Sequence, residues 1–88
     1  MEISIKKLSE AEIQDMGIRD WPIWEKDASK FDWYYDLEEM CLILEGSVTV
    51  SHSGGSSKIK AGDFVTFPKG MECVWEIHED IRKHYKFV

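Results

Sequence analysis

The stretch from Gly62 to Gly70, which reads Gly-Asp-Phe-Val-Thr-Phe-Pro-Lys-Gly, constrains the fold more than any other part of the chain. Gly62 and Gly70 can adopt a positive φ angle, which residues with a side chain rarely do. Pro68 has no backbone N–H to donate to a sheet ladder, so it belongs to a turn or a strand end. The stretch therefore predicts a strand over residues 63–67 that is held between two turns.

The chain from Trp21 onward reads as a series of short strands separated by turn residues. Strands of roughly four to eight residues with this spacing are typical of a sandwich or a barrel. Ser53-Gly54-Gly55-Ser56 is expected to close a hairpin, because two adjacent glycines supply the positive φ that tight turns require. Ile3 and Ile5 alternate with polar neighbours and predict a further short strand. The expected main strands are 33–36, 40–44, 47–52, 57–60, 63–67, 73–78 and 82–87.

One short helix is predicted near the N-terminus. Ser9-Glu10-Ala11-Glu12 is a capping box, in which the Ser side chain accepts from a backbone N–H and the Glu side chain reaches back. The helix should run from about Glu10 to Met16. Gly17 then fits the left-handed position that closes the last helical turn.

Size and charge limit the classes of function. The 88 residues, of which 43% are hydrophobic, are expected to form a single domain over residues 1–88 with one small core. The net charge of −6 would repel nucleic acid and anionic membrane surfaces. No apolar run is long enough to span a bilayer and no signal peptide is evident, so we expect a cytoplasmic protein.

The two Gly-containing stretches resemble the two motifs of the cupin fold. Residues 62–70 match G-D-x(4)-P-x-G, the core of the second cupin motif, and Glu39 to Gly46 looks like the end of the first. The resemblance covers about residues 17–88. It implies an all-β, jelly-roll β-barrel with one short N-terminal helix, whose mouth can hold a small ligand. Segments 21–25, 31–36, 68–70 and 82–85 further resemble the cupin family of unknown function that shares a domain with (S)-ureidoglycine aminohydrolase.

Many cupins bind a divalent metal through two His and one Glu of the first motif and a further His of the second. The motif register places the Glu at Glu39 in this chain. The two His positions fall on Asp32 and Tyr34 with one spacer length, or on Trp33 and Tyr35 with the other. Neither choice yields a histidine, so the imidazoles that suit Fe, Mn, Ni or Zn are missing from this motif.

The fourth ligand position of the resemblance falls on Cys73. We therefore expect no bound metal and no cofactor. A divalent metal such as Mn is the alternative, and its ligands would then come from Glu39, Cys73, Asp32 and His84. His84 alternates with Arg82 and Lys86, which suggests an outward face unless a bulge reverses it. The only two cysteines, Cys41 and Cys73, are expected to be free thiols in small apolar positions.

Strand alternation predicts which side chains face the barrel interior. If Glu39 points inward, Cys41 does too, and Cys73 and Trp75 follow on the other motif. The expected ligand pocket has aromatic walls, and Glu39 and Lys83 are the polar groups that orient a ligand. Each aromatic residue has ordinary core packing as a competing role, and Trp21 and Trp24 are assigned to packing or to a lid or dimer contact. The predicted pocket residues are Trp33, Tyr35, Glu39, Cys41, Cys73, Trp75, Lys83 and Tyr85.

Two functions of different classes are consistent with these features. The first is a metal-independent barrel that binds an unknown small organic molecule, such as an acid or an amide paired with Lys83. The alternative is a metal-dependent enzyme that acts on a C–N bond of a small amide or ureido compound, as (S)-ureidoglycine aminohydrolase does. A buried Glu39 could serve such an enzyme as a general acid or base. In either case we expect a homodimer, with residues 2–6 adding to the partner's sheet.

Overall fold

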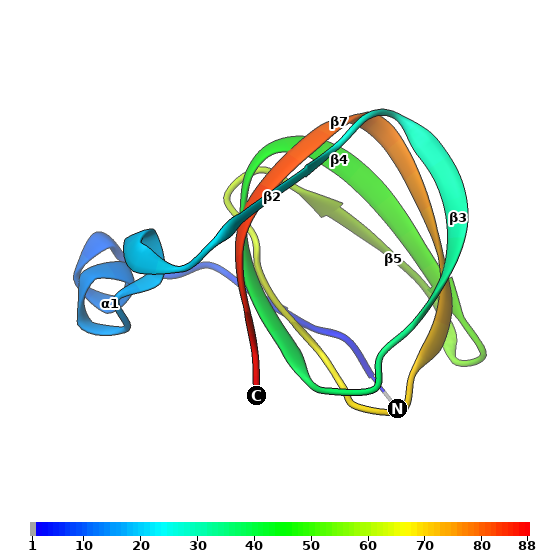
Figure 1. Cartoon of the computed structure of the whole chain (residues 1–88), viewed down its shortest axis with the longest axis horizontal. Coiled ribbons are helices and arrows are strands. Elements are labelled where there is room, and N and C mark those ends of the chain that lie inside the picture. The colour runs from blue at the N-terminus through cyan, green and yellow to red at the C-terminus, as the bar shows by residue number, and fades with distance from the viewer. Residues whose placement is uncertain (1) are drawn as a thin grey trace.

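A computed structural model describes residues 2–88, in which a seven-stranded antiparallel sheet curls into a small barrel. Figure 1 shows the helix α1 outside this barrel, attached to one side. The architecture confirms the predicted all-β fold with one short N-terminal helix. The elements in chain order are β1 (Ser4–Lys6), α1 (Glu10–Asp15), the 3-10 helix η1 (Ile18–Asp20), β2 (Ile23–Lys26), β3 (Ser29–Tyr34), β4 (Glu39–His52), β5 (Gly55–Lys60), β6 (Phe64–Phe67) and β7 (Glu72–Phe87).

The two long strands β4 and β7 pair with each other along most of their length and connect the rest of the sheet. The first part of β4 also pairs with β6, and its last part pairs with β5. Likewise β7 pairs first with β3 and then with β2. Each long strand thus pairs with two short strands as well as with the other long strand. The cavity described below lies among side chains of β2, β3, β4 and β7.

The prediction of four separate strands over 40–44, 47–52, 73–78 and 82–87 was wrong, since β4 and β7 each run through. Residues around Gly46 read as a turn, but the β4–β7 register shifts there by bulges between Ile43 and Val48. A bulge bends a strand without ending its ladder. Gly46 has φ 93°, a conformation that favours glycine, and it lies at a bend within β4 rather than at a turn between two strands.

Replacing Gly46 by Ala should destabilise the protein more than replacing any isolated turn glycine. A Cβ atom at Gly46 would lie 2.3 Å from the Asp80 carbonyl oxygen and 2.7 Å from that of Glu79. Backbone strain alone costs about 1–3 kcal/mol, and this clash adds to it. Gly17→Ala is the matched control, because Gly17 also has a positive φ but a Cβ there meets nothing within 4 Å. Equal losses in the free energy of unfolding, measured with urea, would contradict this account.

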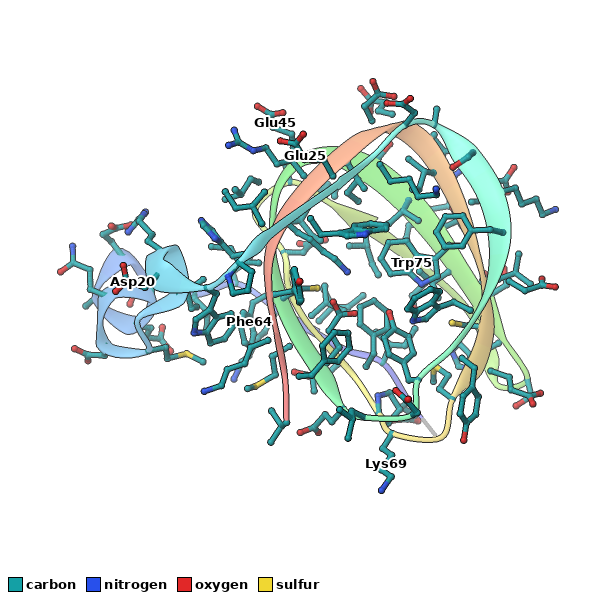
Figure 2. The ribbon with its side chains drawn as sticks, in the orientation of Figure 1. Asp20, Glu25, Glu45, Phe64, Lys69 and Trp75 are labelled. Atoms are coloured by element: carbon teal, nitrogen blue, oxygen red, sulfur yellow. The ribbon has the colours of Figure 1, made fainter. Side chains whose placement is uncertain are left out.

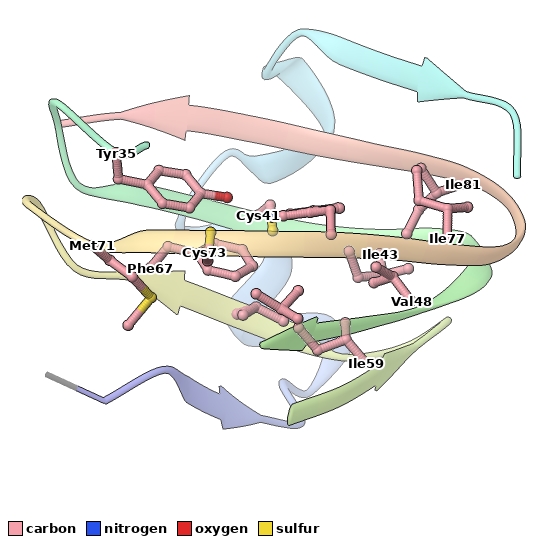
Figure 3. Packing of buried hydrophobic residues seen from close by; sticks show 13 residues of the cluster. Tyr35, Cys41, Ile43, Val48, Ile59, Phe67, Met71, Cys73, Ile77 and Ile81 are labelled. Atoms are coloured by element: carbon pink, nitrogen blue, oxygen red, sulfur yellow. The ribbon is translucent and has the colours of Figure 1, made fainter. Parts of the chain in front are cut away.

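Alternate side chains of β4 face opposite sides of the sheet. Cys41 and Ile43 point into the barrel core, whereas Leu42 packs outside with Ile18 and Phe64 beneath α1 and η1. Figure 3 shows the inner cluster, in which Tyr35, Cys41 and Cys73 lie between the curled strands. Figure 2 shows Trp75 inside the barrel and Phe64 on the side that carries the helix. The outer cluster therefore fixes α1, and the inner one forms the barrel core.

The N-terminal predictions hold in most details. Ser9 and Glu12 form both hydrogen bonds of the capping box, and Gly17 has φ 66° directly after the helix cap. The sequence did not predict η1. The 53–56 hairpin is confirmed, with His52 opposite Gly55, although only the second of its two glycines has a positive φ. No helix in residues 2–88 is long and apolar enough to cross a membrane.

β1 forms its ladder with β6 of its own chain, with Ile5 opposite Val65. The expected addition of residues 2–6 to a partner's sheet stays a prediction. Because β1 ends the sheet order, its outer edge has no strand beside it within residues 2–88. Formation of a homodimer stays a prediction.

Candidate ligand-binding site

A cavity of about 160 Å³ lies among side chains of β2, β3, β4 and β7 and of the segment after β3. It leads from the exposed rings of Trp33 and Phe87 to the buried rings of Tyr35 and Trp75. Its walls are aromatic, and Glu39 and Lys83 are the charged residues among them. The lining residues are Trp24, Phe31, Trp33, Tyr35, Glu39, Trp75, Lys83, Tyr85 and Phe87.

A buried ion pair joins the two charged residues. Lys83 Nζ donates a hydrogen bond to Glu39 Oε2 at 2.8 Å, and the side chains are 5% and 4% exposed. The pair forms because Glu39 begins β4 and Lys83 lies opposite Ile43 on β7, which puts both on the inner face of neighbouring strands. A charge this deep would be costly alone, and each residue compensates the other.

Aromatic rings surround the ammonium group of Lys83. Nζ lies 4.6 Å from the ring centre of Trp75, 4.8 Å from that of Trp24 and 5.9 Å from that of Phe67. The negative faces of such rings attract a cation, most strongly when water is excluded. An ammonium has three N–H donors, and a single one of them donates to a protein oxygen within residues 2–88. Lys83 thus keeps donor capacity toward the cavity.

Burial keeps the Tyr35 hydroxyl and the two cysteine thiols neutral. Burial, and next the carboxylate of Glu39, raise the pKa of Tyr35 far above its usual value. Burial likewise raises the pKa of Cys41 to about 12 and raises that of Cys73. Both thiols are therefore protonated at neutral pH, and thiols in this form are poor nucleophiles and metal ligands.

The structure brings most of the predicted pocket residues together around this cavity. Trp33, Tyr35, Glu39, Trp75, Lys83 and Tyr85 line it, whereas Cys41 and Cys73 do not. Both cysteines face inward as their strand parity predicted, but Cys41 is fully enclosed in the core. Cys73 Sγ donates to the Trp33 carbonyl oxygen at 3.6 Å.

Sequence reasoning missed Trp24, Phe31 and Phe87 as lining residues. Trp24 lies on β2, which was not predicted as a strand, and Phe31 lies on the part of β3 before the predicted start. The usable signal was the spacing of two from Phe31 through Trp33 to Tyr35, which puts the three rings on one face. Phe87 shares the parity of Lys83 and Tyr85, so strand alternation puts all three side chains on one face of β7.

The residues do not fit the metal site that cupins commonly build. Asp32 is exposed on the face of β3 opposite Phe31 and Trp33. His84 lies outside the barrel, where its Nδ1 is 2.9 Å from the Trp21 carbonyl oxygen, an atom that can only accept. Glu39 is committed to Lys83. Within residues 2–88, no three His, Cys, Asp or Glu side chains lie close enough together to hold a metal ion.

His84 had been the histidine considered as a metal ligand. Its alternation with Arg82 and Lys86 indicated an outward face, and the structure confirms that face. The outward side is nonetheless buried at this point, because η1 and Trp21 cover it.

Solved structures and a curated relative resemble this chain. A DUF861-family protein from Thermotoga maritima is 46% identical, with a TM-score of 0.96 over 99% of this chain and all of that one. A putative ethanolamine utilization protein Q from Salmonella typhimurium shares the fold, with a TM-score of 0.67 at 22% identity over 99% of this chain and 69% of that one.

The curated relative is the acetate kinase EutQ of Salmonella typhimurium, which is 32% identical over 59 residues. The match covers 67% of this chain, which spans about a quarter (26%) of that protein. The EutQ-like cupin domain family matches residues 13–85, and these residues include both motifs and every residue that lines the cavity except Phe87. The two cupin motifs, the curled sheet and this match agree, and the chain belongs to the EutQ-like cupin domain family.

Proposed function

We propose that this protein binds a small neutral organic molecule, with a carbonyl or amide oxygen, in the aromatic cavity and without a metal. The observation that carries the proposal is the buried Lys83–Glu39 pair inside an otherwise aromatic cavity. The volume of about 160 Å³ suits a compound near the size of benzene, which a protein cavity of roughly 150 Å³ can hold. Such a combination of apolar walls and few polar groups is typical of small-molecule sites.

The ion pair favours a neutral ligand over an acid. Glu39 already compensates the charge of Lys83, so a bound carboxylate would place a second negative charge beside a buried one. An amide or ketone oxygen can instead accept one of the N–H groups of Lys83 that point to aromatic rings. The apolar part of the ligand would then pack against Trp24 and Trp75.

Other activities have less support. The Salmonella protein is named an acetate kinase, and a kinase must bind the negatively charged phosphoryl group that it transfers. The one cation that lines this cavity within residues 2–88, Lys83, is already paired with Glu39. A metal-dependent hydrolase of the ureidoglycine type would need donors that Asp32, Cys73 and His84 do not bring to Glu39. Reversible binding requires neither phosphate contacts nor metal ligands.

Benzamide should bind wild-type protein and quench its tryptophan fluorescence, because three of the four tryptophans line the cavity. The variant Glu39→Gln/Lys83→Met keeps the shape without leaving a charge unpaired. It should bind benzamide about ten- to a hundredfold more weakly, through loss of one charge-assisted hydrogen bond.

Lys86→Met is the matched control for this experiment. Lys86 lies on the same strand but is exposed and does not line the cavity, so its loss should leave the affinity unchanged. The proposal fails if wild type shows no saturable binding, or if the double variant binds as well as wild type.

A further inference from the structure

We infer that Lys83 forms a reversible protonated imine with a small aldehyde that enters the aromatic cavity. This inference rests on the proposed function and makes it more specific, since the carbonyl group of the ligand becomes the electrophile. It assigns the site a ligand class, small apolar aldehydes, and a covalent step on a named atom, Lys83 Nζ.

Lys83 differs from every other lysine of the chain in its surroundings. Its side chain is 5% exposed and lines a cavity, whereas the other lysines are exposed. Lysine is rarely buried unless it is paired, and a lysine enclosed by apolar rings is one of the known ways to obtain an amine nucleophile. The exposed lysines are Lys6, Lys7, Lys26, Lys30, Lys58, Lys60, Lys69 and Lys86.

Glu39 supplies the proton acceptor that the amine needs. The 2.8 Å hydrogen bond from Nζ to Oε2 gives the ammonium proton a direct path to the carboxylate. Transfer along it leaves an amine and a carboxylic acid, both neutral, and a site with little water penalises neutral groups less than charged ones. The amine lone pair is then free to attack a carbonyl carbon held beside it.

The step balances in atoms and charge. The lone pair of Nζ forms the C–N bond, and the carbonyl oxygen becomes a hydroxyl group as one N–H proton moves to it through Glu39. Glu39 then gives its acid proton to that hydroxyl, which leaves as water while the C=N bond forms. The sum is one ammonium and one aldehyde giving one protonated imine and one water, with Glu39 again a carboxylate. No oxidant, reductant or metal takes part.

The product fits the site because it keeps the charge where the ammonium carried it. A protonated imine at Nζ retains the attraction to Glu39 and to the rings of Trp24 and Trp75, which lie 4.8 and 4.6 Å from Nζ. The apolar group of the aldehyde occupies the aromatic part of the cavity. The half-exposed ring of Trp33 marks the side on which the aldehyde enters and the water leaves.

Reductive trapping tests the inference on the full chain. The protein is incubated at neutral pH with limiting benzaldehyde and sodium cyanoborohydride, which converts an imine to a stable secondary amine. Peptide mapping by mass spectrometry then gives the rate at each lysine. Lys83 should be labelled at least about tenfold faster than the exposed lysines, because binding holds the aldehyde beside Nζ. Excess benzamide should slow the labelling of Lys83 and leave the others unchanged.

Two variants serve as controls. The variant Lys86→Met should still be labelled rapidly at Lys83. The variant Glu39→Gln/Lys83→Met should be labelled only at the slow rate of the exposed lysines. Equal rates at all lysines, or an unlabelled Lys83, would overturn the imine while leaving benzamide binding intact. Absence of saturable benzamide binding would instead overturn the proposed function, so the two failures can be told apart.

Discussion

Replacing Lys83 by Met should lower the free energy of unfolding by about 3–5 kcal/mol, because Glu39 would remain buried without its partner. Adding Glu39→Gln to this variant should recover much of the loss, since no unpaired charge then remains. Urea unfolding of the wild type, both single variants and the double variant gives the coupling energy of the pair. Lys86→Met should change stability little, because Lys86 is exposed.

Replacing Trp75 by Ala should also cost about 3–5 kcal/mol of unfolding free energy, through lost burial and the cavity that remains. Trp75 is 2% exposed, and its ring packs against those of Trp24, Phe31 and Phe67 at 5.9, 6.1 and 5.5 Å between centres. The substitution Trp75→Ala also removes the ring nearest to the Lys83 ammonium, so the affinity for benzamide should fall as well.

Trp33→Ala is the matched control for this second substitution. Trp33 lines the same cavity from the rim and is 47% exposed, so its truncation should cost clearly less stability while still weakening binding. Equal stability losses at Trp33 and Trp75 would show that the inner end of the cavity is not the packed aromatic wall described above.

Local backbone chemistry made much of the fold predictable. The glycines and the proline of residues 62–70 flank β6 as expected. The capping box predicted the bounds of α1 to within one residue. These features depend only on residues that are close together in the sequence, so they can be recognised from the sequence alone. The bulge at Gly46 was beyond this reasoning, because it depends on the approach of Asp80 from another strand.

For the candidate site, strand alternation indicated which side chains share a face, but it did not indicate which of them contact each other. Alternation placed Lys83 and Tyr85 on one face of their strand, the inward direction of Glu39 was the starting assumption, and all three side chains line the cavity. The ion pair joins residues 44 positions apart, and its formation depends on the register between β4 and β7, which places Glu39 opposite Phe87 and Ile43 opposite Lys83. For the same reason Trp24 was assigned to packing: the ladder between β2 and β7 places it opposite Lys83, and no local signal marks that contact.

A crystal structure of the protein with benzamide would test the central claim most directly. The account predicts the benzamide ring in the cavity against Trp75, with its oxygen roughly 2.7–3.2 Å from Lys83 Nζ. The Lys83–Glu39 hydrogen bond should remain in place beside it. Benzamide bound elsewhere, or a cavity filled by the protein's own side chains with Lys83 contacting Glu39 alone, would contradict the claim that this pair orients a ligand.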